Sequence, residues 1–464
     1  MRVLRVCALL VAAAAVLFGQ TPQREVSLIV TGGTVITVDQ ADRVLAPGAV
    51  AIDGRDIVAV GTVEEIGRRF TSAETIDAAG RVVIPGLINT HTHAPMVLYR
   101  GLADDLALME WLQKYIFPAE AKTVSPEFVR AGTRLAALEM IQSGTTAYAD
   151  MYYFEEEIAR ATKEAGIRGV LGQTIIQFPV PDAKTPADGI ARATAFMREW
   201  KNDPLIVPAI APHSMYTLDA GTLKTIRATA DREQAPVIIH LAETSDEVRV
   251  AREKYKTTPT QFLESLGFWG ERTLAAHGVH LVPADIQILA KRRVGVSHNP
   301  ESNMKLASGT APVLAMQAAG IAVGLGTDGA ASNNDLDMFE AMRQAAFLHK
   351  LTSKDPRALP ARTALRMATI DGARTLGMEK EVGSLEAGKR GDLIVVSMKS
   401  ARQTPLYDPL SHLVYVTRGD DVQTMVVDGR VVMRDRRVTT LNESAVLDEA
   451  IGWARKVRQA VQQH

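Results

Sequence analysis

The stretch VVIPGLINTHTHAP, residues Val82–Pro95, is an apolar run that ends in two histidines, His91 and His93. In an extended strand, residues i and i+2 point to the same side, so both imidazoles would lie close enough to share one ion. The pair is equally compatible with two polar residues at the point where a strand meets a loop. The choice between a metal site and a strand end therefore depends on partners elsewhere in the chain.

The segment from Ile84 to Leu376 contains further apolar strand-like runs, and each is followed by a helix-like stretch. One such stretch, SPEFVRAGTRLAALEMIQSG, carries apolar residues at helical spacing, with Ser125–Pro126 as its start signal and Gly144 as its stop. With PGLINTHTH as the first, the further strand-like runs are GTTAYADMY, RGVLGQTII, LIVPAIAP, PVIIHLAE, TLAAHGVHL, VGVSHNP and AVGLGTDGA.

Eight such repeats predict an α/β fold, a (β/α)8 barrel of the TIM type over residues 84–376. The alternative is an open doubly wound sheet. That fold usually carries a Gly-rich phosphate loop after its first strand, whereas the first run here ends in NTHTH.

Short alternating runs punctuated by Gly and Asp occupy both ends of the chain. They predict one small β-sandwich domain composed of residues 23–83 and 377–445, with an antiparallel sheet in its N-terminal part. The Gly32–Gly33 pair is interpreted as a tight turn between two strands. Residues 446–464 are predicted to form an amphipathic C-terminal helix.

The composition excludes several classes of function. A net charge of −1 and 5% aromatic residues argue against a protein that binds nucleic acid or anionic membranes. The single cysteine, Cys7, excludes an intrachain disulfide and any cysteine-rich zinc site. A metal ion in this chain would have to be held by His, Asp and Glu.

Residues 1–22 resemble a secretory signal peptide. Arg2 and Arg5 precede an apolar run, Val6–Phe18, which is shorter than a membrane-spanning helix. Cleavage near Gly19–Gln23 would export the protein to the periplasm or beyond, without stable membrane insertion. The alternatives are an uncleaved anchor or a misassigned start codon, and without a signal the protein would be cytoplasmic.

Side chains that can bind metal or move protons follow four of the eight runs. In barrels of this kind the active site lies at the carboxyl ends of the strands, so these residues would meet at one place. A lone H-x-H is a weak signal, but four consistent strand ends favour a metal site. The residues are His91 and His93 after the first run, His240 and Glu243 after the fifth, His277 after the sixth and Asp328 after the eighth.

The chain resembles the amidohydrolase superfamily over nearly its whole length beyond the signal. Within it, the chain is most similar to the deaminases that act on 5′-methylthioadenosine and S-adenosylhomocysteine. The blocks that carry this resemblance are PGLINTHTHAPMVLYRGLADDLALMEWL, PHSMYT, HLAETSDE, AAHGVHL, SHNPESNMKLASGTAPV and LGTDGAASNNDLDMFEAMR.

The resemblance implies a metal-dependent hydrolytic deaminase that replaces the amino group at C6 of an adenine nucleoside and releases ammonia. The implied metal ligands are His91, His93, His240 and Asp328. The third and fourth runs contain no lysine to bridge a second metal, so one divalent ion is expected. Zinc suits these ligands, and Fe²⁺, Mn²⁺ or Ni²⁺ are compatible with them.

The implied catalytic residues are Glu243, His277 and Asp328. Metal binding would lower the pKa of a water molecule. Glu243 would then carry a proton from this water to the ring nitrogen and on to the departing amine. His277 would orient and polarise the water, and Asp328 would also accept a proton from it. His280 is interpreted as structural.

The same blocks imply a set of substrate contacts. Trp111 would pack on the substrate, although a core aromatic on an amphipathic helix is an equal alternative. Gln173 stands where the family carries an arginine, which places S-adenosylhomocysteine, with its carboxylate, in doubt. The remaining expected contacts are Glu120 at the ribose hydroxyls, His213 at the ribose or the ring, Ser332 at the 5′ side, and Glu243 at the reacting atoms.

Other functions stay open. The same site could act on another amino- or chloro-substituted ring, such as guanine, a pterin or a triazine. A non-catalytic descendant that binds metabolites is the third possibility, but the intact ligand set and Glu243 count against it. Family membership also implies a homo-oligomer, for which no surface patch in the sequence gives support.

Overall fold

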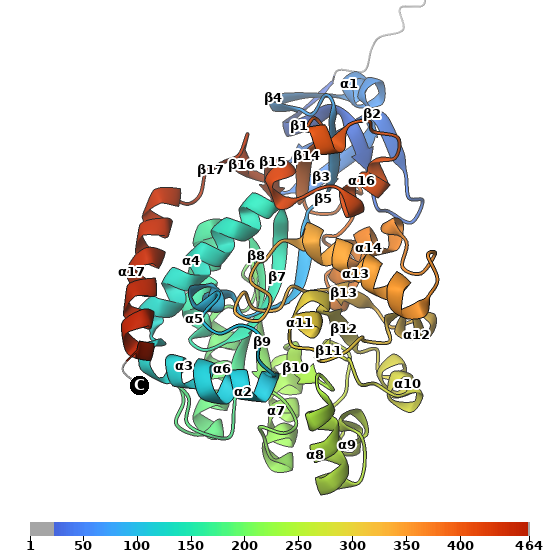
Figure 1. Cartoon of the computed structure of the whole chain (residues 1–464). Coiled ribbons are helices and arrows are strands. Elements are labelled where there is room, and N and C mark those ends of the chain that lie inside the picture. Colours follow the sequence, from blue (N-terminus) through green and yellow to red (C-terminus); the bar gives the residue numbers. More distant parts are fainter. Residues whose placement is uncertain (1–22, 463–464) are drawn as a thin grey trace, which may run out of the picture.

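The structure is a computed structural model that describes residues 23–462, and it contains two separate sheets (Figure 1). The predicted signal peptide, residues 1–22, lies outside the described residues. Within residues 23–462, no helix is both long and apolar enough to cross a membrane.

The larger sheet is an eight-stranded parallel barrel, as predicted. Its strands are hydrogen-bonded in chain order from β6 to β13. At the seam, the Asp328 amide donates to the His91 carbonyl over 3.0 Å, which joins the last strand end to the first. The strands are β6 (Leu87–Thr92), β7 (Thr145–Tyr152), β8 (Arg168–Ile175), β9 (Ile206–Pro212), β10 (Val237–Leu241), β11 (Thr273–His277), β12 (Gly295–His298) and β13 (Val323–Leu325).

These strands read as continuous apolar runs because both of their faces are covered. All eight residues of β7 and of β8 are buried, between the barrel interior and the outer helices. The covering helices are α4 (Pro126–Ser143), α5 (Glu155–Ala165), α6 (Pro186–Glu199), α7 (Ala220–Glu233), α8 (Ser245–Tyr255), α9 (Pro259–Ser265), α10 (Pro283–Lys291), α11 (Pro300–Lys305), α12 (Val313–Ala318), α13 (Met338–Ser353), α14 (Ala361–Met367) and α15 (Ile370–Thr375).

Helix α4 begins and ends where its sequence signals indicate. The Ser125 hydroxyl accepts a hydrogen bond from the Phe128 amide, which satisfies a free donor of the first turn. Gly144 has φ 90°, a left-handed conformation that glycine adopts without steric cost, and it ends the helix.

Strands from both ends of the chain form the second sheet, which lies at one end of the barrel (Figure 1). The nine strands pair into one continuous sheet. Helix α1 (Val63–Arg69) packs on its strands, and helix α16 (Pro409–Tyr415) packs against α13 and α14. The strands are β1 (Arg24–Ile36), β2 (Val44–Asp53), β3 (Asp56–Thr62), β4 (Phe70–Asp77), β5 (Arg81–Pro85), β14 (Leu393–Ser397), β15 (Val422–Val427), β16 (Arg430–Arg434) and β17 (Arg437–Val438).

Two local predictions for this sheet are wrong. The sheet is mixed, because β1 pairs in parallel with both β4 and β5. The Gly32–Gly33 pair lies inside β1, where the register with β2 shifts, and makes an irregularity within one strand instead of a turn between two. Gly32 has φ 87°, and a Cβ on Gly33 would lie 2.8 Å from the Ala78 carbonyl oxygen, so both glycines are required there.

The long β6–α4 connection is folded into short helical pieces. They are η1 (Ala94–Tyr99), α2 (Leu108–Trp111), the π-helical turn η2 (Leu112–Ile116) and α3 (Phe117–Thr123). The α2–α3 segment lies at the end of the barrel away from the mixed sheet (Figure 1). The C-terminal helix α17 (Glu443–Gln462) runs along the side of the barrel (Figure 1).

Candidate metal centre and cavity

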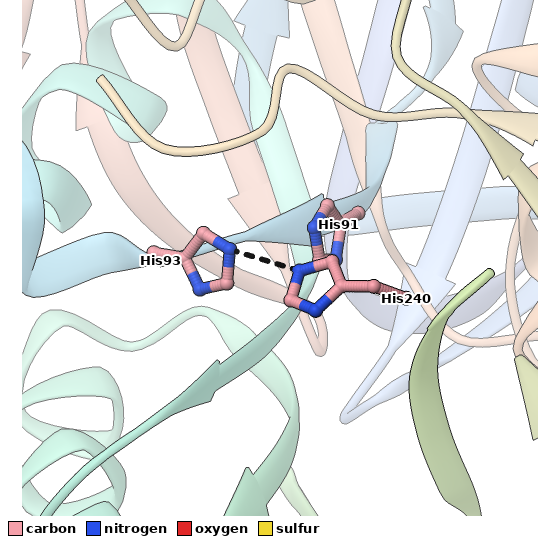
Figure 2. A group of neighbouring side chains, drawn as sticks. All are labelled: His91, His93 and His240. Carbon is pink, nitrogen blue, oxygen red and sulfur yellow. Dashed lines mark hydrogen bonds between the residues drawn. The ribbon is translucent and has the colours of Figure 1, made fainter. Parts of the chain in front are cut away.

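Three imidazoles converge at the carboxyl ends of β6 and β10 (Figure 2). His91 is the fifth residue of β6, His93 follows that strand directly, and His240 is the fourth residue of β10. The side-chain nitrogens of the three lie within 4.8 Å of one another. The strand ends therefore bring together residues that are about 150 positions apart in the sequence, as the barrel fold predicts.

Asp328 completes this group from the end of β13. Its Oδ1 atom lies 3.5 Å from His91 Nε2 and 3.4 Å from His93 Nε2. Ligands about 2.0–2.1 Å from a tetrahedral zinc ion lie about 3.3 Å from one another. The spacing of these side-chain atoms is therefore that of a tetrahedral ligand set.

The hydrogen bonds of the rings fix which nitrogens face the centre. His93 Nδ1 lies 2.7 Å from the Met151 carbonyl oxygen, and His240 Nδ1 lies 2.9 Å from that of His213. A carbonyl oxygen can only accept, so each Nδ1 carries the proton and each Nε2 presents a lone pair. Both nitrogens of His91 are buried without a hydrogen-bond partner. The rings therefore fit a cation, and burial lowers the pKa of His91 and of His240, which favours the neutral ligand form.

Polar groups of the neighbouring loop orient the Asp328 carboxylate. The Ser302 and Ser332 hydroxyls donate to Oδ2 over 2.6 and 3.0 Å, and the Gly329 amide donates to Oδ1 over 2.7 Å. Burial alone would raise the pKa of Asp328, but the neighbouring histidines and the Ser302 hydroxyl hold it well below its usual range. The carboxylate is thus ionised and held in place, as metal binding requires.

Glu243 and His277 flank the cluster. Glu243 Oε1 lies 3.9 Å from His277 Nε2, and both side chains are buried. Burial raises the pKa of Glu243. Burial would lower the pKa of His277, but the carboxylates of Glu243 and Asp328 together raise it above its ordinary value. On its other side, His277 Nδ1 lies 2.9 Å from Asn303 Oδ1, which fixes the ring.

Three strand ends near the cluster adopt left-handed backbone conformations at residues other than glycine. The φ angles are 48° at Ala242, 77° at His277 and 63° at Asp328. Such conformations cost free energy and concentrate at functional sites. They turn the chain sharply at the strand ends, so that consecutive side chains are directed toward the same point.

A cavity of about 630 Å³ opens from the cluster toward the α2–α3 segment. Trp111 of α2 and Glu120 of α3 line it, and both are nearly fully buried. The Tyr152 hydroxyl donates to Glu120 Oε1 over 2.7 Å. Burial nevertheless raises the pKa of Glu120 to about 7. A buried carboxylate with a free oxygen beside a cavity is suited to accept hydrogen bonds from hydroxyls of a ligand.

Most of the predicted site residues lie in this one cavity wall. Its described lining includes His93, Trp111, Glu120, His213, His240, Glu243, His277, Asp328 and Ser332. His91 lies behind the lining, fully buried beneath the other rings. His298, at the end of β12, does not line the cavity, and its Nε2 lies 3.2 Å from His349 Nε2.

The sequence matches a family model described as "Amidohydrolase family" over residues 82–432. The chain belongs to the amidohydrolase family. A relative from Syntrophus aciditrophicus, "5-methylthioadenosine/S-adenosylhomocysteine deaminase 1", is 45% identical over 94% of this chain and 99% of its own. A relative from Methanosarcina acetivorans, "5'-deoxyadenosine deaminase", is 46% identical over 91% of this chain and 96% of its own.

A solved structure of similar fold is that of an adenosine deaminase from Xanthomonas campestris with bound zinc. It is 39% identical, covers 94% of this chain and 100% of its own, and superimposes with a TM-score of 0.93. With relatives named as deaminases, this amidohydrolase is a hydrolase that acts on carbon–nitrogen bonds. Its cluster of three histidines and one aspartate is a divalent metal centre.

Gln173 of this amidohydrolase is not placed as a substrate contact would be. It is fully buried, its Nε2 donates to Asp182 Oδ2 over 2.8 Å, and it does not line the cavity. Its neighbour Thr174 lines the cavity instead. Successive residues of a strand point to opposite sides. An error of one position in predicting the end of β8 therefore selects Gln173 as the cavity-facing residue in place of Thr174.

Ser332 lines the cavity as expected, but its hydroxyl is committed to Asp328 and to the Gly329 carbonyl. Sequence reasoning missed Tyr152 and Tyr153, which line the cavity from the end of β7. The signal was present in the second apolar run, GTTAYADMY, because a polar group after a barrel strand faces the same cavity as the other strand ends. Ser302 was also missed, since its partner Asp328 is distant in the sequence.

Proposed function

We propose that this amidohydrolase hydrolytically deaminates adenine nucleosides of the adenosine, 5′-methylthioadenosine and S-adenosylhomocysteine type at C6. The products are ammonia and the corresponding inosine analogue. The observation that carries the proposal is what one cavity wall holds: three of the four metal ligands, the neighbouring Glu243 and His277, and the isolated carboxylate of Glu120. The first two supply chemistry at one end of a ligand, and Glu120 supplies recognition of hydroxyls.

Three imidazoles and one carboxylate would hold a single zinc ion, which would lower the pKa of a water molecule so that it attacks at neutral pH. The single ion is consistent with the lining of the cavity, since no lysine is found among its described residues to bridge a second metal. The named Xanthomonas neighbour binds zinc, which supports zinc over the other divalent ions.

Glu243 is suited to move protons at the reacting carbon. Its raised pKa lets it take a proton from the attacking water and give it up again within the same turnover. The proton passes to the ring nitrogen next to C6, and a second transfer to the amino group allows ammonia to leave. The overall reaction consumes one water and leaves Glu243 in its starting protonation state.

His277 is suited to orient the water and to stabilise negative charge as the water adds to the ring. Its raised pKa favours the protonated ring, and Nδ1 is already bonded to Asn303. The Nε2 proton is then free to donate toward the cavity. A donor directed at developing charge in a buried site is worth far more than the same donor in water.

Binding would depend on the far end of the cavity. Glu120, which keeps one oxygen free of the Tyr152 hydroxyl, would accept hydrogen bonds from the two ribose hydroxyls. Trp111 and Phe117 present aromatic surface to the same space, and aromatic rings pack well against a purine. His213 is held neutral, because burial lowers its pKa to about 3, and it would serve as a hydrogen-bonding partner.

An ammonia-release assay tests the proposal. The zinc-loaded protein would be given adenosine, 5′-methylthioadenosine, 5′-deoxyadenosine, S-adenosylhomocysteine, guanine and an aminated triazine. We expect turnover of the adenine nucleosides, with the inosine analogue as product by mass spectrometry. Turnover of guanine or the triazine alone would contradict the proposal and assign the site to another ring.

A further inference from the structure

The charged side chains in the lining of the cavity limit which ligands it can hold. None of the described residues that line it is lysine or arginine, whereas Glu120, Glu243 and Asp328 are carboxylates. Glu243 and Asp328 adjoin the histidine cluster, but Glu120 stands on α3 with only the Tyr152 hydroxyl as its partner. An anionic group of a ligand near Glu120 would be buried without a counter-charge, which is strongly unfavourable.

Two further cavities, of about 870 and 800 Å³, adjoin this one and offer space into which a substituent can extend. One shares Phe117 and His213 with the main cavity, and the other shares Phe117 and Glu120. Phe178, on the loop after β8, lines both of these adjoining cavities and packs edge-on against Phe117 at 5.7 Å between ring centroids. Lys254 is the one basic side chain among the described residues that line either of them.

The cation next to the end of β8 is already neutralised. Arg192 of α6 donates to Glu156, and its Nε lies 3.3 Å from Asp182 Oδ2. The Gln173 amide donates to the same Asp182 oxygen. Neither Arg192 nor Gln173 lines any of the three cavities. The β8 side of the site therefore offers an anionic ligand group no partner.

We propose that this site selects adenine nucleosides whose 5′ substituent carries no anionic group, an inference that rests on the proposed function. With C6 at the metal centre and the ribose at Glu120, the 5′ group lies among apolar side chains such as Met96, Leu108 and Leu306. A methyl, hydroxymethyl or methylthiomethyl group suits that lining. A phosphate or carboxylate does not, so nucleotides and S-adenosylhomocysteine are turned over less efficiently than adenosine and 5′-methylthioadenosine.

A matched pair of substrates isolates the charge. We choose 5′-(3-carboxypropylthio)adenosine and its primary carboxamide, which share their length and shape and differ by one negative charge. We expect kcat/KM for the amide to exceed that for the carboxylate at least about tenfold, because the anion must be buried without a counter-charge. Equal values of kcat/KM for the two would overturn the inference.

A gain-of-charge variant tests the same point from the side of the protein. Phe178→Arg places a guanidinium in the two cavities that adjoin the main one, and Phe178→Gln is the matched uncharged control. We expect the arginine variant to raise the carboxylate-to-amide ratio of kcat/KM several-fold, and the glutamine variant to leave that ratio unchanged. An unchanged ratio in both variants would show that charge is not the basis of selection.

Lys254→Ala provides the opposite test. If the wild-type protein uses the carboxylate as well as the amide, and this variant selectively loses the carboxylate, then Lys254 supplies the counter-charge and the inference is wrong. Failure of the parent proposal looks different, since the zinc-loaded protein would then release ammonia from neither adenosine nor either analogue. Turnover of adenosine together with full use of the carboxylate would overturn only the inference.

Discussion

The Nε2 atoms of His93 and His240 lie 3.3 Å apart, although each ring donates its Nδ1 proton to a backbone carbonyl. With both Nδ1 protons in place, two lone pairs face each other across a buried space (Figure 2). That arrangement is repulsive between neutral rings and becomes attractive when a cation lies between them. The second hydrogen bonds of the rings thus shape the site for metal before any metal binds.

Removal of the metal should therefore destabilise the protein as well as inactivate it. The free energy of unfolding gains about 4 kcal/mol when free zinc exceeds its dissociation constant about 1,000-fold. We expect a chelator to lower Tm and abolish activity, with both restored by added zinc. His91→Ala should leave the purified protein without metal by elemental analysis, while His349→Gln, a buried histidine outside the cluster, should keep about one ion per chain.

Glu243→Gln should separate chemistry from metal binding. The amide keeps the size of the side chain but cannot accept a proton, so we expect kcat to fall at least about 100-fold. Metal content should stay near that of the wild type, because Glu243 is not a ligand in the proposed site. Asp246→Asn, at an exposed carboxylate three residues along the chain, is the control and should leave kcat unchanged. Loss of metal from the Glu243 variant would contradict the proton-transfer role.

Glu120 should give substrate binding a pH dependence. Burial raises its pKa from the ordinary 4.5 to about 7, so the ionised form that accepts hydrogen bonds from a ribose is lost as the pH falls below about 7. We expect KM for adenosine to rise toward acidic pH, and this rise to be absent in Glu120→Gln. A KM profile that is unchanged by the substitution would remove Glu120 from the binding site.

The same group predicts an effect on stability with a defined sign. In the unfolded chain Glu120 loses its proton near pH 4.5, but in the folded chain only near 7. The folded state holds the proton more tightly, so this group's contribution to stability is present at low pH and is lost as the pH rises through that window. Glu120→Gln should consequently raise Tm above pH 7 while it weakens substrate binding. A lower Tm at that pH would contradict this account.

The sequence predicts the barrel and the metal ligands because both depend on patterns that are local to a strand end. Each apolar run and the His or Asp after it lie within a few residues of one another, and the barrel fold supplies the long-range geometry. The choice between Gln173 and Thr174 could not be made this way, since it depends on where β8 stops pairing. The sequence also could not predict which strands pair with one another. The parallel pairing of β1 with β4 and β5 is an example.

A buried ion network joins the two sheets, and the sequence alone could not predict it because its members are far apart in the chain. Arg168 at the start of β8 donates to Asp392 Oδ2 and Asp428 Oδ1, each over 2.7 Å, and the Arg168 and Asp392 side chains are 2% exposed. Asp392 precedes β14 and Asp428 follows β15, so one guanidinium joins the barrel to the mixed sheet.

Arg168→Met would leave the Asp392 carboxylate buried without its ion-pair partner, while Asp428 would keep its pair with Arg55. Removal of one partner of a buried ion pair typically costs about 3–5 kcal/mol. We expect a loss of that order in the free energy of unfolding by denaturant titration. Arg24→Met, which breaks an exposed pair with Asp53, is the matched control and should cost less than about 1 kcal/mol. Similar losses in the two variants would mean that Arg168 contributes no more than a surface ion pair, and that apolar packing alone holds the mixed sheet against the barrel.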